Sequence, residues 1–291
     1  MGIIKRISLN KTFIINKTYS ITKSILSIFA FFASIFSFDD FVNRDKSNLL
    51  QNLFSFFLFV FILIVILFLI FSIYALFINK RKITDFSNNH SLIVMFGDIF
   101  RLPKNDSINV IIPVNRCFDT IVDDELISNN TLHGIFLKKL FCESNFNQET
   151  LNSHIQNNLK KSDFDYEVLE EKDKKKGNLK RYQLGTVVEI KSSNVNYFLV
   201  GLSKFDYNLH AMVNEKEYLF CMSEILEYIE KHSQGYKTYI PLIGAGHSAI
   251  YQDEQMLLEF MLKLIQLNKR KVNCDITIVL SEKSKSRISI L

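Results

Sequence analysis

The chain of 291 residues is long enough for a domain of ordinary size together with a smaller unit. Its net charge of +5 does not call for a nucleic-acid partner, because much of the excess flanks two hydrophobic segments near the N-terminus. Four widely spaced cysteines without a CxxC pair exclude a short disulfide framework, so we expect reduced, mostly buried thiols. No HExxH motif or carboxylate cluster has metal-binding spacing.

The second hydrophobic segment, from Leu53 to Ile78, contains no charged residue. About 20 apolar residues cross roughly 30 Å of hydrocarbon as a helix, and this run exceeds that length. A core helix of a soluble protein would have a polar face, and this segment has none. The sequence therefore predicts a membrane-spanning helix at about residues 53–78.

The first hydrophobic segment, Ser24–Phe38, is shorter. It reaches spanning length from Thr18 if Lys23 extends its ammonium group towards the lipid head groups. A signal peptide and an interfacial helix are the competing interpretations. The segment has no small-residue cleavage site and no strongly charged face, which favours a spanning helix at about residues 18–38.

The charges beside these segments predict their orientation. Five cations lie at or before the start of the first helix and three follow the second, whereas the connector carries more acids than bases. By the positive-inside rule, both termini face the cytoplasm and the protein is a multi-pass protein of the cell (inner) membrane. Neither predicted helix has an ionisable group near its middle, so nothing marks a proton relay or an ion filter. If the helices form a pore, they must do so as an oligomer. Residues 1–82 form the predicted membrane region and residues 83–291 a cytoplasmic domain.

Strands and helices alternate in the predicted cytoplasmic domain. Its apolar runs, separated by helices, are typical of a mainly parallel sheet with helices on both faces. We expect a turn with solvated charges at Asp173–Asn178 and a linker around RKITDF. Ser128, Asn129 or Asn130 could cap the first helix of the domain. The predicted strands are Ser91–Phe96, Asn109–Val114, Tyr182–Ile190, Asn196–Leu202, Lys237–Ile243 and Asp275–Leu280, and the helices are Thr131–Cys142, Gln148–Lys161, Glu215–Lys231 and Glu254–Leu267.

Ligands bind beyond the carboxyl ends of the strands in such sheets, so the loops from Gly97, Asn115 and Gly244 are candidates. The GAGHS loop at Gly244–Ser248 could bring backbone N–H groups close to an anion at a helix start, or could simply be a tight turn. Asp98 could accept a hydrogen bond from an adenine amino group or cap a turn. The loop after Asn115 could contact ribose or phosphate, or be ordinary turn chemistry.

Cys117, His247 and Asp119 could converge as a catalytic triad, but no nucleophile-elbow pattern supports it. His133 and His210 stand alone and are expected to be core or surface residues. The residues themselves therefore predict no catalytic group.

Together the three loops resemble those of the macro domain, a fold that binds ADP-ribose. GDIF at Gly97–Phe100 is similar to the family's Gly-Asp-Ile element, and Asn115 matches the asparagine that opens its first binding loop. SNNTLHGIF at Ser128–Phe136 takes the place of the glycine-rich stretch and helix start, and PLIGAGHSAI at Pro241–Ile250 resembles the phosphate-cradling second loop. VNRCFDTIVDDELIS, followed by LHG and PLIGAG, is similar to the macro domains of the Thoeris anti-phage defence systems.

The resemblance implies an α/β macro domain with a mixed, mainly parallel sheet between helices, preceded by a two-helix transmembrane hairpin. That architecture resembles the membrane effector of the type II Thoeris systems. The implied ligand-binding residues are Asp98, Ile99, Asn115, Arg116, Cys117, Phe118, Asp119, Thr120, Leu132, His133, Gly134, Gly244, Ala245, Gly246, His247 and Ser248.

In that family a partner TIR-domain enzyme consumes NAD and makes an ADP-ribose-containing signal, histidine-ADP-ribose where identified. The resemblance implies that the macro domain binds the signal and that the helices, as a homo-oligomer in the lipid bilayer, then disrupt the membrane. It implies no metal, no cofactor beyond this ADP-ribose derivative and no nucleic acid.

Two departures from hydrolytic macro domains favour a sensor over an enzyme. The chain lacks their run of three or four glycines and the second asparagine of their first loop. A membrane-tethered ADP-ribosyl hydrolase is the alternative function. A two-helix scaffold whose domain binds a protein is a third.

Overall fold

The computed structural model describes residues 2–35, 49–86, 88–103, 106–162, 164–245 and 253–291. They divide into two compact units, one of residues 1–79 with 285–291 and the other of residues 80–284. We describe each unit by itself.

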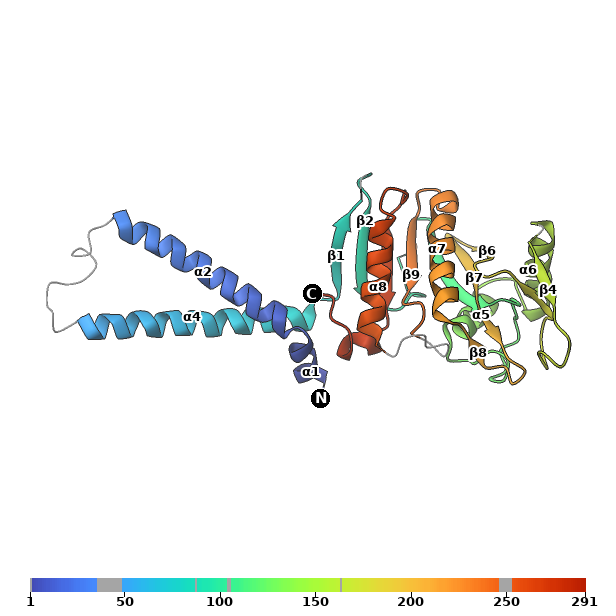
Figure 1. The fold of residues 1–291 in the computed structure, drawn as a ribbon, viewed down its shortest axis with the longest axis horizontal. Helices are drawn as coiled ribbons and strands as arrows, with labels where there is room; N and C mark the ends of the chain where they lie inside the picture. Colours follow the sequence, from blue (N-terminus) through green and yellow to red (C-terminus); the bar gives the residue numbers. More distant parts are fainter. Residues whose placement is uncertain (1, 36–48, 87, 104–105, 163, 246–252) are drawn as a thin grey trace. The chain divides into compact units, whose positions relative to one another are not determined.

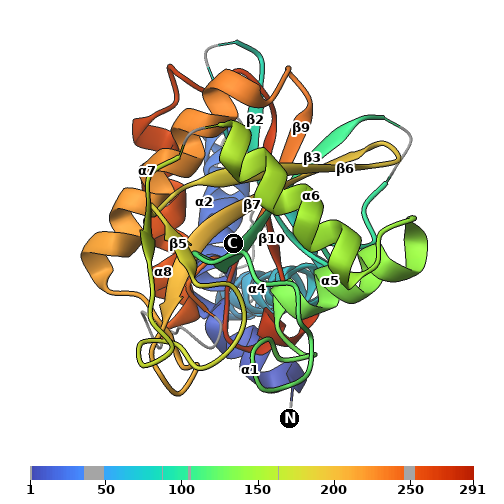
Figure 2. The same ribbon diagram turned by 90° about the vertical axis from the view of Figure 1, so that its right-hand side faces the viewer.

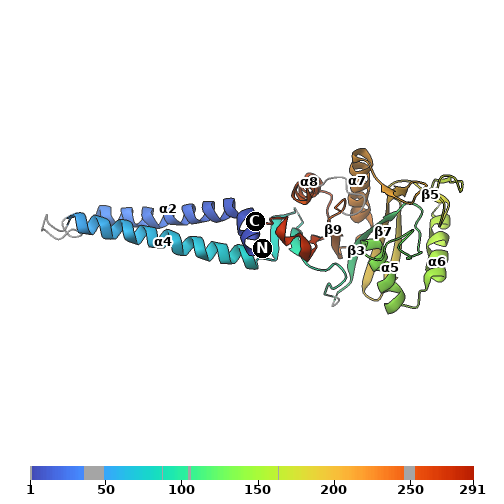
Figure 3. The ribbon, with the colours of Figure 1, turned by 90° about the horizontal axis from the view of Figure 1, so that it is seen from below.

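The first unit is helical (Figure 1). A short helix, α1 (Gly2–Leu9), precedes α2 (Lys11–Ile35), which lies antiparallel to α4 (Leu49–Phe77) (Figure 3). Arg6 of α1 donates from Nε to the carbonyl oxygen of Ala75 (3.1 Å) and from Nη2 to that of Ile78 (2.5 Å). A cation thus satisfies carbonyl groups that the last turn of α4 leaves without helical partners.

Among the described residues, one helical stretch, Phe54–Phe77, is long and apolar enough to cross a membrane, with a mean hydropathy of 3.5. Length and composition therefore support the second predicted span. The helix α2 begins earlier than the predicted 18–38 and carries more polar residues, so the first span stays a prediction. Residues 36–38 lie outside the described part of the chain.

The second unit is built on a sheet in the order β1-β2-β10-β9-β3-β7-β6, with β8 added to β7. The strands from β2 to β7 in that order run parallel, and β1 and β6 are antiparallel edges. This confirms the predicted mixed, mainly parallel sheet. The strands are β1 (Lys80–Asp85), β2 (Ser91–Phe96), β3 (Ile108–Asn115), β6 (Val187–Ser192), β7 (Val195–Phe205), β8 (Ala211–Met212), β9 (Lys237–Pro241) and β10 (Ile276–Leu280).

Helices cover both faces of this sheet (Figures 2 and 3). On one face lie α5 (Leu132–Glu143) and α6 (Gln148–Lys161), and on the other lie α7 (Glu215–His232) and α8 (Glu254–Leu267). Alternate residues of β3, Val110, Ile112 and Val114, join the core cluster that contains the buried side chains of α5 and α6. A 3₁₀ helix (Glu282–Ser286) follows the last strand.

Three local predictions were wrong. The expected linker around RKITDF contains β1, an exposed edge strand whose hydrogen bonds to β2 are not visible in a polar sequence. The expected strand Tyr182–Ile190 is broken at Gly185 (φ +83°), so its start belongs to a separate two-stranded sheet, β4 (Tyr166–Val168) and β5 (Lys180–Tyr182). The cap of α5 is Thr131, whose hydroxyl accepts from the N–H of Gly134.

Candidate functional site

A cleft of about 520 Å³ opens where β3 and β9 end. Its walls come from the loop after β3, the start of α5, the end of β7 with β8, and the loop after β9. The carboxyl ends of parallel strands are where ligands bind in open α/β sheets, and the cleft lies within the range of small-molecule sites. Its described lining includes Asn115, Asp124, Leu126, Ile127, Ser128, Leu132, His133, Ser203, Phe205, Leu209, His210 and Gly244.

Asn115 supplies the most informative polar atom of the cleft. It is the last residue of β3 and its side chain is buried. Its Oδ1 accepts a hydrogen bond from the backbone N–H of Cys117 at 3.0 Å. The side-chain nitrogen, Nδ2, is therefore the end of the amide that is left for a ligand. Its Nδ2 is buried and has no hydrogen-bond partner among the described residues. A buried donor left unsatisfied costs about 1–3 kcal/mol, so an acceptor atom of a ligand would be stabilising there.

The N-terminus of α5 faces the same cleft, since Thr131, Leu132 and His133 all line it. The first N–H groups of a helix have no intrahelical partners, and the helix dipole favours an anion beside them. Gly134 lets the start of α5 pack against the backbone of Ser128, because a Cβ atom there would lie 2.2 Å from the carbonyl oxygen of Ser128. Burial lowers the pKa of His133 to about 3, so its imidazole is neutral at physiological pH.

The loop after Asn115 is held by a buried ion pair. Nζ of Lys174 lies 2.7 Å from Oδ2 of Asp119, and neither side chain is more than 1% exposed. The backbone N–H of Asn178 donates to Oδ1 of Asp119, and its side-chain Nδ2 donates to the carbonyl oxygens of Cys117 and Phe118. Burial raises the pKa of the Asp119 carboxyl, and Lys174 opposes that rise. Asp119 is therefore committed to internal bonds.

The prediction of a solvated charged turn at Asp173–Asn178 is thus wrong for its first lysine, Lys174. The next two lysines also meet acids of the loop after β3. Lys175 pairs with Glu125 at 3.0 Å, and Lys176 pairs with Asp123 and Glu125 at 2.6 Å. Three consecutive lysines therefore bind one acidic loop, which local sequence did not reveal.

The side chains of Arg116, Cys117 and Phe118, in the same loop, make contacts away from the cleft. The Nε of Arg116 donates to the carbonyl oxygen of Tyr182 at 2.8 Å. The pKa of its guanidinium is lowered mainly because burial desolvates it, and to a smaller extent because Arg181 carries the same charge. Burial raises the pKa of Cys117 to about 11, so its thiol is protonated and a poor nucleophile. The buried ring of Phe118 packs edge-on against Tyr182. None of the three lines the described part of the cleft, and Thr120 is buried beside them with its hydroxyl bonded to the carbonyl oxygen of Gln148.

The hairpin of β7 and β8 forms a wall that the sequence did not predict. Phe205, Leu209 and His210 line the cleft from it, and Leu209 has a φ of +68°. Oδ1 of Asp206 accepts from the backbone N–H of His210 at 2.8 Å, closing the turn. The Asp-Tyr-Asn run at 206–208 was the available turn signal.

The loop after β9 contributes Gly244, which lines the cleft with a φ of +97°, a left-handed conformation that favours glycine. The carbonyl oxygen of the preceding Ile243 accepts from the hydroxyl of Tyr218 at 3.0 Å, which ties the loop to α7. Ala245 is described and half-buried. Gly246, His247 and Ser248 lie outside the described residues, so the structure does not place this part of the candidate site.

Comparison with known proteins identifies the family of this chain. The family model of the macro domain of Thoeris protein ThsA matches residues 92–281. The Thoeris protein ThsA of Bacillus amyloliquefaciens (strain Y2) is 30% identical over 225 residues, which cover 75% of this chain and 70% of that protein. This chain belongs to the Thoeris ThsA macro-domain family.

Solved structures similar to this ThsA-family chain include an Oceanobacillus iheyensis macrodomain with MES bound, at 11% identity and a TM-score of 0.45. The matched region covers 71% of this chain and 90% of the macrodomain chain. A variant of that macrodomain with ADPR is 12% identical with a TM-score of 0.47, covering 71% and 93% of the two chains.

Two of the residues that resemble the Gly-Asp-Ile element of macro domains lie apart from the described cleft of this ThsA-family domain. Asp98 follows β2, and its Oδ1 accepts from the backbone N–H of Phe100 at 2.9 Å, as expected for a turn cap. Its other oxygen lies 3.5 Å from Arg101, and about half of the side chain is exposed. Ile99 is buried in the core. A carboxylate oxygen of Asp98 thus remains reachable from solvent.

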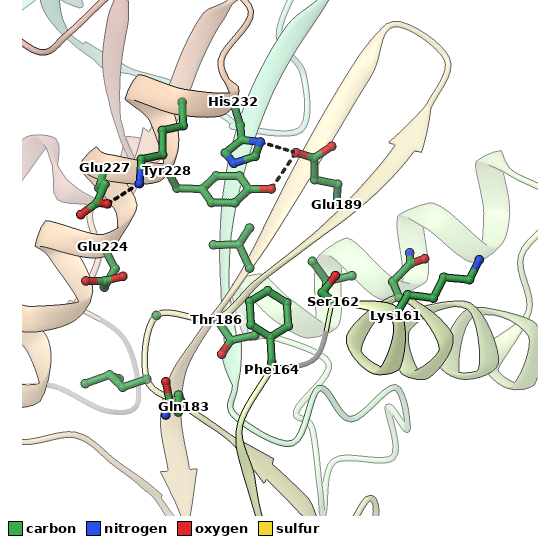
Figure 4. A pocket seen from close by; sticks show the side chains of 16 residues that line it. Lys161, Ser162, Phe164, Gln183, Thr186, Glu189, Glu224, Glu227, Tyr228 and His232 are labelled. Atoms are coloured by element: carbon green, nitrogen blue, oxygen red, sulfur yellow. Dashed lines mark hydrogen bonds and ion pairs between the residues drawn. The ribbon is translucent and has the colours of Figure 1, made fainter.

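The ThsA-family domain has a second hollow, of about 590 Å³, at the free edge of β6 between α6 and α7 (Figure 4). The hydroxyl of Tyr228 donates to Glu189 at 2.7 Å, and the ring stacks on His232. The hollow is about as large as the cleft at β3 and β9. However, the buried donors without partners among the described residues do not line it. Size alone therefore does not make it the candidate site.

Proposed function

We propose that this chain is an effector of anti-phage defence whose macro domain senses an ADP-ribose-containing nucleotide and whose membrane helices produce the response. The observation that carries the sensor role is the buried Nδ2 of Asn115, which has no described partner in a cleft of nucleotide-accommodating size. Membership of the ThsA family supports the same role.

The chemistry of the cleft suits a sugar phosphate. Asn115 offers a neutral donor, the start of α5 offers backbone N–H groups with a helix dipole, and Gly244 allows close approach of a loop. Among the described lining residues there is no lysine or arginine. Recognition would therefore depend on directed hydrogen bonds, which discriminate ribose and pyrophosphate geometry better than a point charge does.

The state of the two described triad candidates supports binding without hydrolysis. The Cys117 thiol is buried and protonated, and both carboxylate oxygens of Asp119 accept hydrogen bonds from within the protein. A nucleophile and an orienting carboxylate need to be available to a base and a substrate. We therefore propose a sensor and keep ADP-ribosyl hydrolysis as an outcome of the test.

The proposed response is disruption of the cell membrane by α4 and α2 as two spans with both termini in the cytoplasm. Signal production by a TIR-domain partner, an adduct such as histidine-ADP-ribose, and homo-oligomerisation belong to this proposal. A ligand drives such a change only through different affinities for the resting and active states.

Calorimetric titration of the full chain in detergent with ADP-ribose tests the sensor role. Asn115→Asp keeps the Oδ1 acceptor and replaces the Nδ2 donor with a second carboxylate oxygen, so we expect binding to weaken at least about 10-fold. Asn157→Asp, the same change at an exposed position of α6, is the matched control and should bind as the wild type does. Absence of binding to ADP-ribose and its adducts would overturn the proposal, and turnover of ADP-ribosylated protein would replace it with the hydrolase.

The membrane response is tested separately with the full chain in dye-loaded liposomes. We expect dye release that increases when ADP-ribose or an adduct is added. Binding without any release under all ligands would retain the sensor and remove the membrane function.

A further inference from the structure

The helix α2 pairs with α4 in a way that fixes the depth of Lys23. The ring of Phe13 stacks on Tyr74 at 6.0 Å, and the ring of Phe29 meets Phe59 at 6.3 Å. Interpolating along two antiparallel helices of equal rise places Lys23 level with about residue 64. That is close to the middle of Phe54–Phe77. If α4 spans the membrane, Lys23 lies near its centre, deeper than the sequence predicted.

A lysine at that depth does not reach the head groups. Half of the hydrocarbon core is about 15 Å thick, whereas an extended lysine side chain reaches about 6 Å. Neither α2 nor α4 contains an acidic residue that could neutralise it. Ionisable residues inside membranes almost always face a bundle interior or a water-filled cavity. The single hairpin offers neither, because Lys23 is exposed.

Lys23 belongs to a polar face of α2, formed by Asn16, Ser20, Lys23 and Ser27, all exposed. Spacings of four, three and four residues put these side chains on one side of the helix. The opposite side, with Ile14, Thr18 and Thr22, is buried. The exposed surface of α4, in contrast, consists largely of phenylalanine, isoleucine and leucine and suits lipid. One helix of the pair therefore has a side that lipid does not solvate.

A depression of about 380 Å³ runs along α2 beside the polar face. Lys23 and Ser27 of the polar face form one side of it, and Tyr19, Thr22, Leu26 and Ala30 line the rest. Small residues at a helix surface allow close approach of another helix in a membrane, and serine and threonine can hydrogen-bond across the contact.

We propose that copies of this chain associate in the membrane through the polar face of α2, so that the Lys23 side chains line a shared, water-filled interior. The proposal rests on the membrane placement in the proposed function and adds which helix lines the interior. A second copy is the occupant because it brings the same polar face, and closed symmetric assemblies of identical chains bury such faces together. A ring of lysines in a pore favours anions.

Disulfide cross-linking of the full chain in membranes tests the contact without a need for conduction. In a Cys142→Ser background, which removes the exposed native thiol, Ser20→Cys and Ser27→Cys should form covalent dimers with copper phenanthroline. Ile28→Cys, exposed on another side of α2, is the control and should give at least about 5-fold less dimer. The assay is run with and without ADP-ribose. Equal yields at all three positions, or none in either condition, would overturn the proposal.

Ion selectivity tests the lining by Lys23. In planar bilayers with a KCl gradient and ADP-ribose present, we expect the wild type to prefer chloride and Lys23→Glu to reverse the sign of the reversal potential. Lys17→Glu, which changes a cation of α2 outside the polar face, should leave the sign unchanged. A Lys23→Glu channel with unaltered selectivity would overturn the lining role. A wild type that never conducts counts against the proposed membrane response, while the cross-linking result still decides the contact.

Discussion

The ammonium group of Lys174 lies 2.7 Å from the carboxylate of Asp119, and neither side chain is appreciably exposed to solvent. Because Asp119 belongs to the loop that begins at Asn115, this pair connects the candidate site to a turn more than fifty residues later. Removing one partner of a buried pair leaves an uncompensated charge, which is more costly than never having had the pair.

Lys174→Met is therefore expected to lower the free energy of unfolding by about 3–5 kcal/mol. Thermal unfolding of the full chain in detergent, followed by tyrosine fluorescence, measures the change. Lys175→Met removes a partly exposed pair with Glu125 and should cost less than about 1 kcal/mol. A double variant, Asp119→Asn with Lys174→Met, should recover part of the loss. Equal effects of the two single lysine variants would contradict the buried-pair account.

Gly177→Ala should destabilise the domain more than an alanine at another left-handed glycine. Gly177 has a φ of +89°, and a Cβ atom there would lie 2.3 Å from Oδ1 of Asp119. Gly235 has a φ of +75° with nothing within 4 Å of its Cβ position, so Gly235→Ala reports the backbone cost alone, about 1 kcal/mol. We expect the Gly177 variant to lose at least about 1 kcal/mol more. Similar melting temperatures for the two variants would be the contrary result.

His133 should make the domain less stable in mild acid. Its folded pKa of about 3 lies below the unfolded value near 6.5, so the unfolded chain binds a proton that the folded chain excludes. Stability therefore falls as pH decreases through 6.5 and stops falling near the folded pKa. Between pH 6.5 and 5 the loss is about 2 kcal/mol, or about 4–8 °C in melting temperature.

The His133→Leu variant removes this titration and should show a smaller drop in melting temperature from pH 7 to pH 5. His154→Gln, at an exposed position of α6, serves as the control and should keep the wild-type drop. An unchanged drop in the His133 variant would show that other groups govern acid sensitivity.

Gly134→Ala should weaken ADP-ribose binding, since its methyl group would meet the carbonyl oxygen of Ser128 and displace the start of α5. We expect at least about a 10-fold loss of affinity by calorimetry, because directed hydrogen bonds depend on helix position. Lys138→Ala, exposed on the same helix, should bind normally. Unaltered binding by the Gly134 variant would remove the N-terminus of α5 from the site.

Apolar patterning made much of the fold predictable. The strands Ser91–Phe96 and Asp275–Leu280 are nearly continuous apolar runs because both faces of a parallel sheet are covered, and the helices α6 and α8 begin and end where their patterns do. The edge strand β1 escaped prediction because its side chains are mostly exposed and its sequence is polar. An edge strand is defined by its backbone bonds, which leave little trace in composition.

The candidate site was predictable only where a residue type carries its own chemistry. Asn115 and the glycines at 134 and 244 were identified, and the structure places them at the cleft or at its edge. The burial of Lys174 was not predictable, because the run DKKKGN has the composition of a solvated turn and its carboxylate partner lies far away in sequence. The wall formed by Leu209 and His210 was also missed, because the position of the β7–β8 hairpin depends on where β7 ends.

The ion pairs of Lys174, Lys175 and Lys176 differ in how they respond to salt. Lys174 with Asp119 is dry, so dissolved ions barely screen it, whereas the pairs of Lys175 and Lys176 are partly exposed and weaken as ionic strength rises. The loop from Asp119 to Glu125 is therefore held firmly near the end of β3 by a buried pair. It is held more weakly at Glu125, which lines the cleft. If this loop moves to admit a bulky ligand, its Glu125 end would move first. The positions of Asp119 and Asn115 would then stay unchanged.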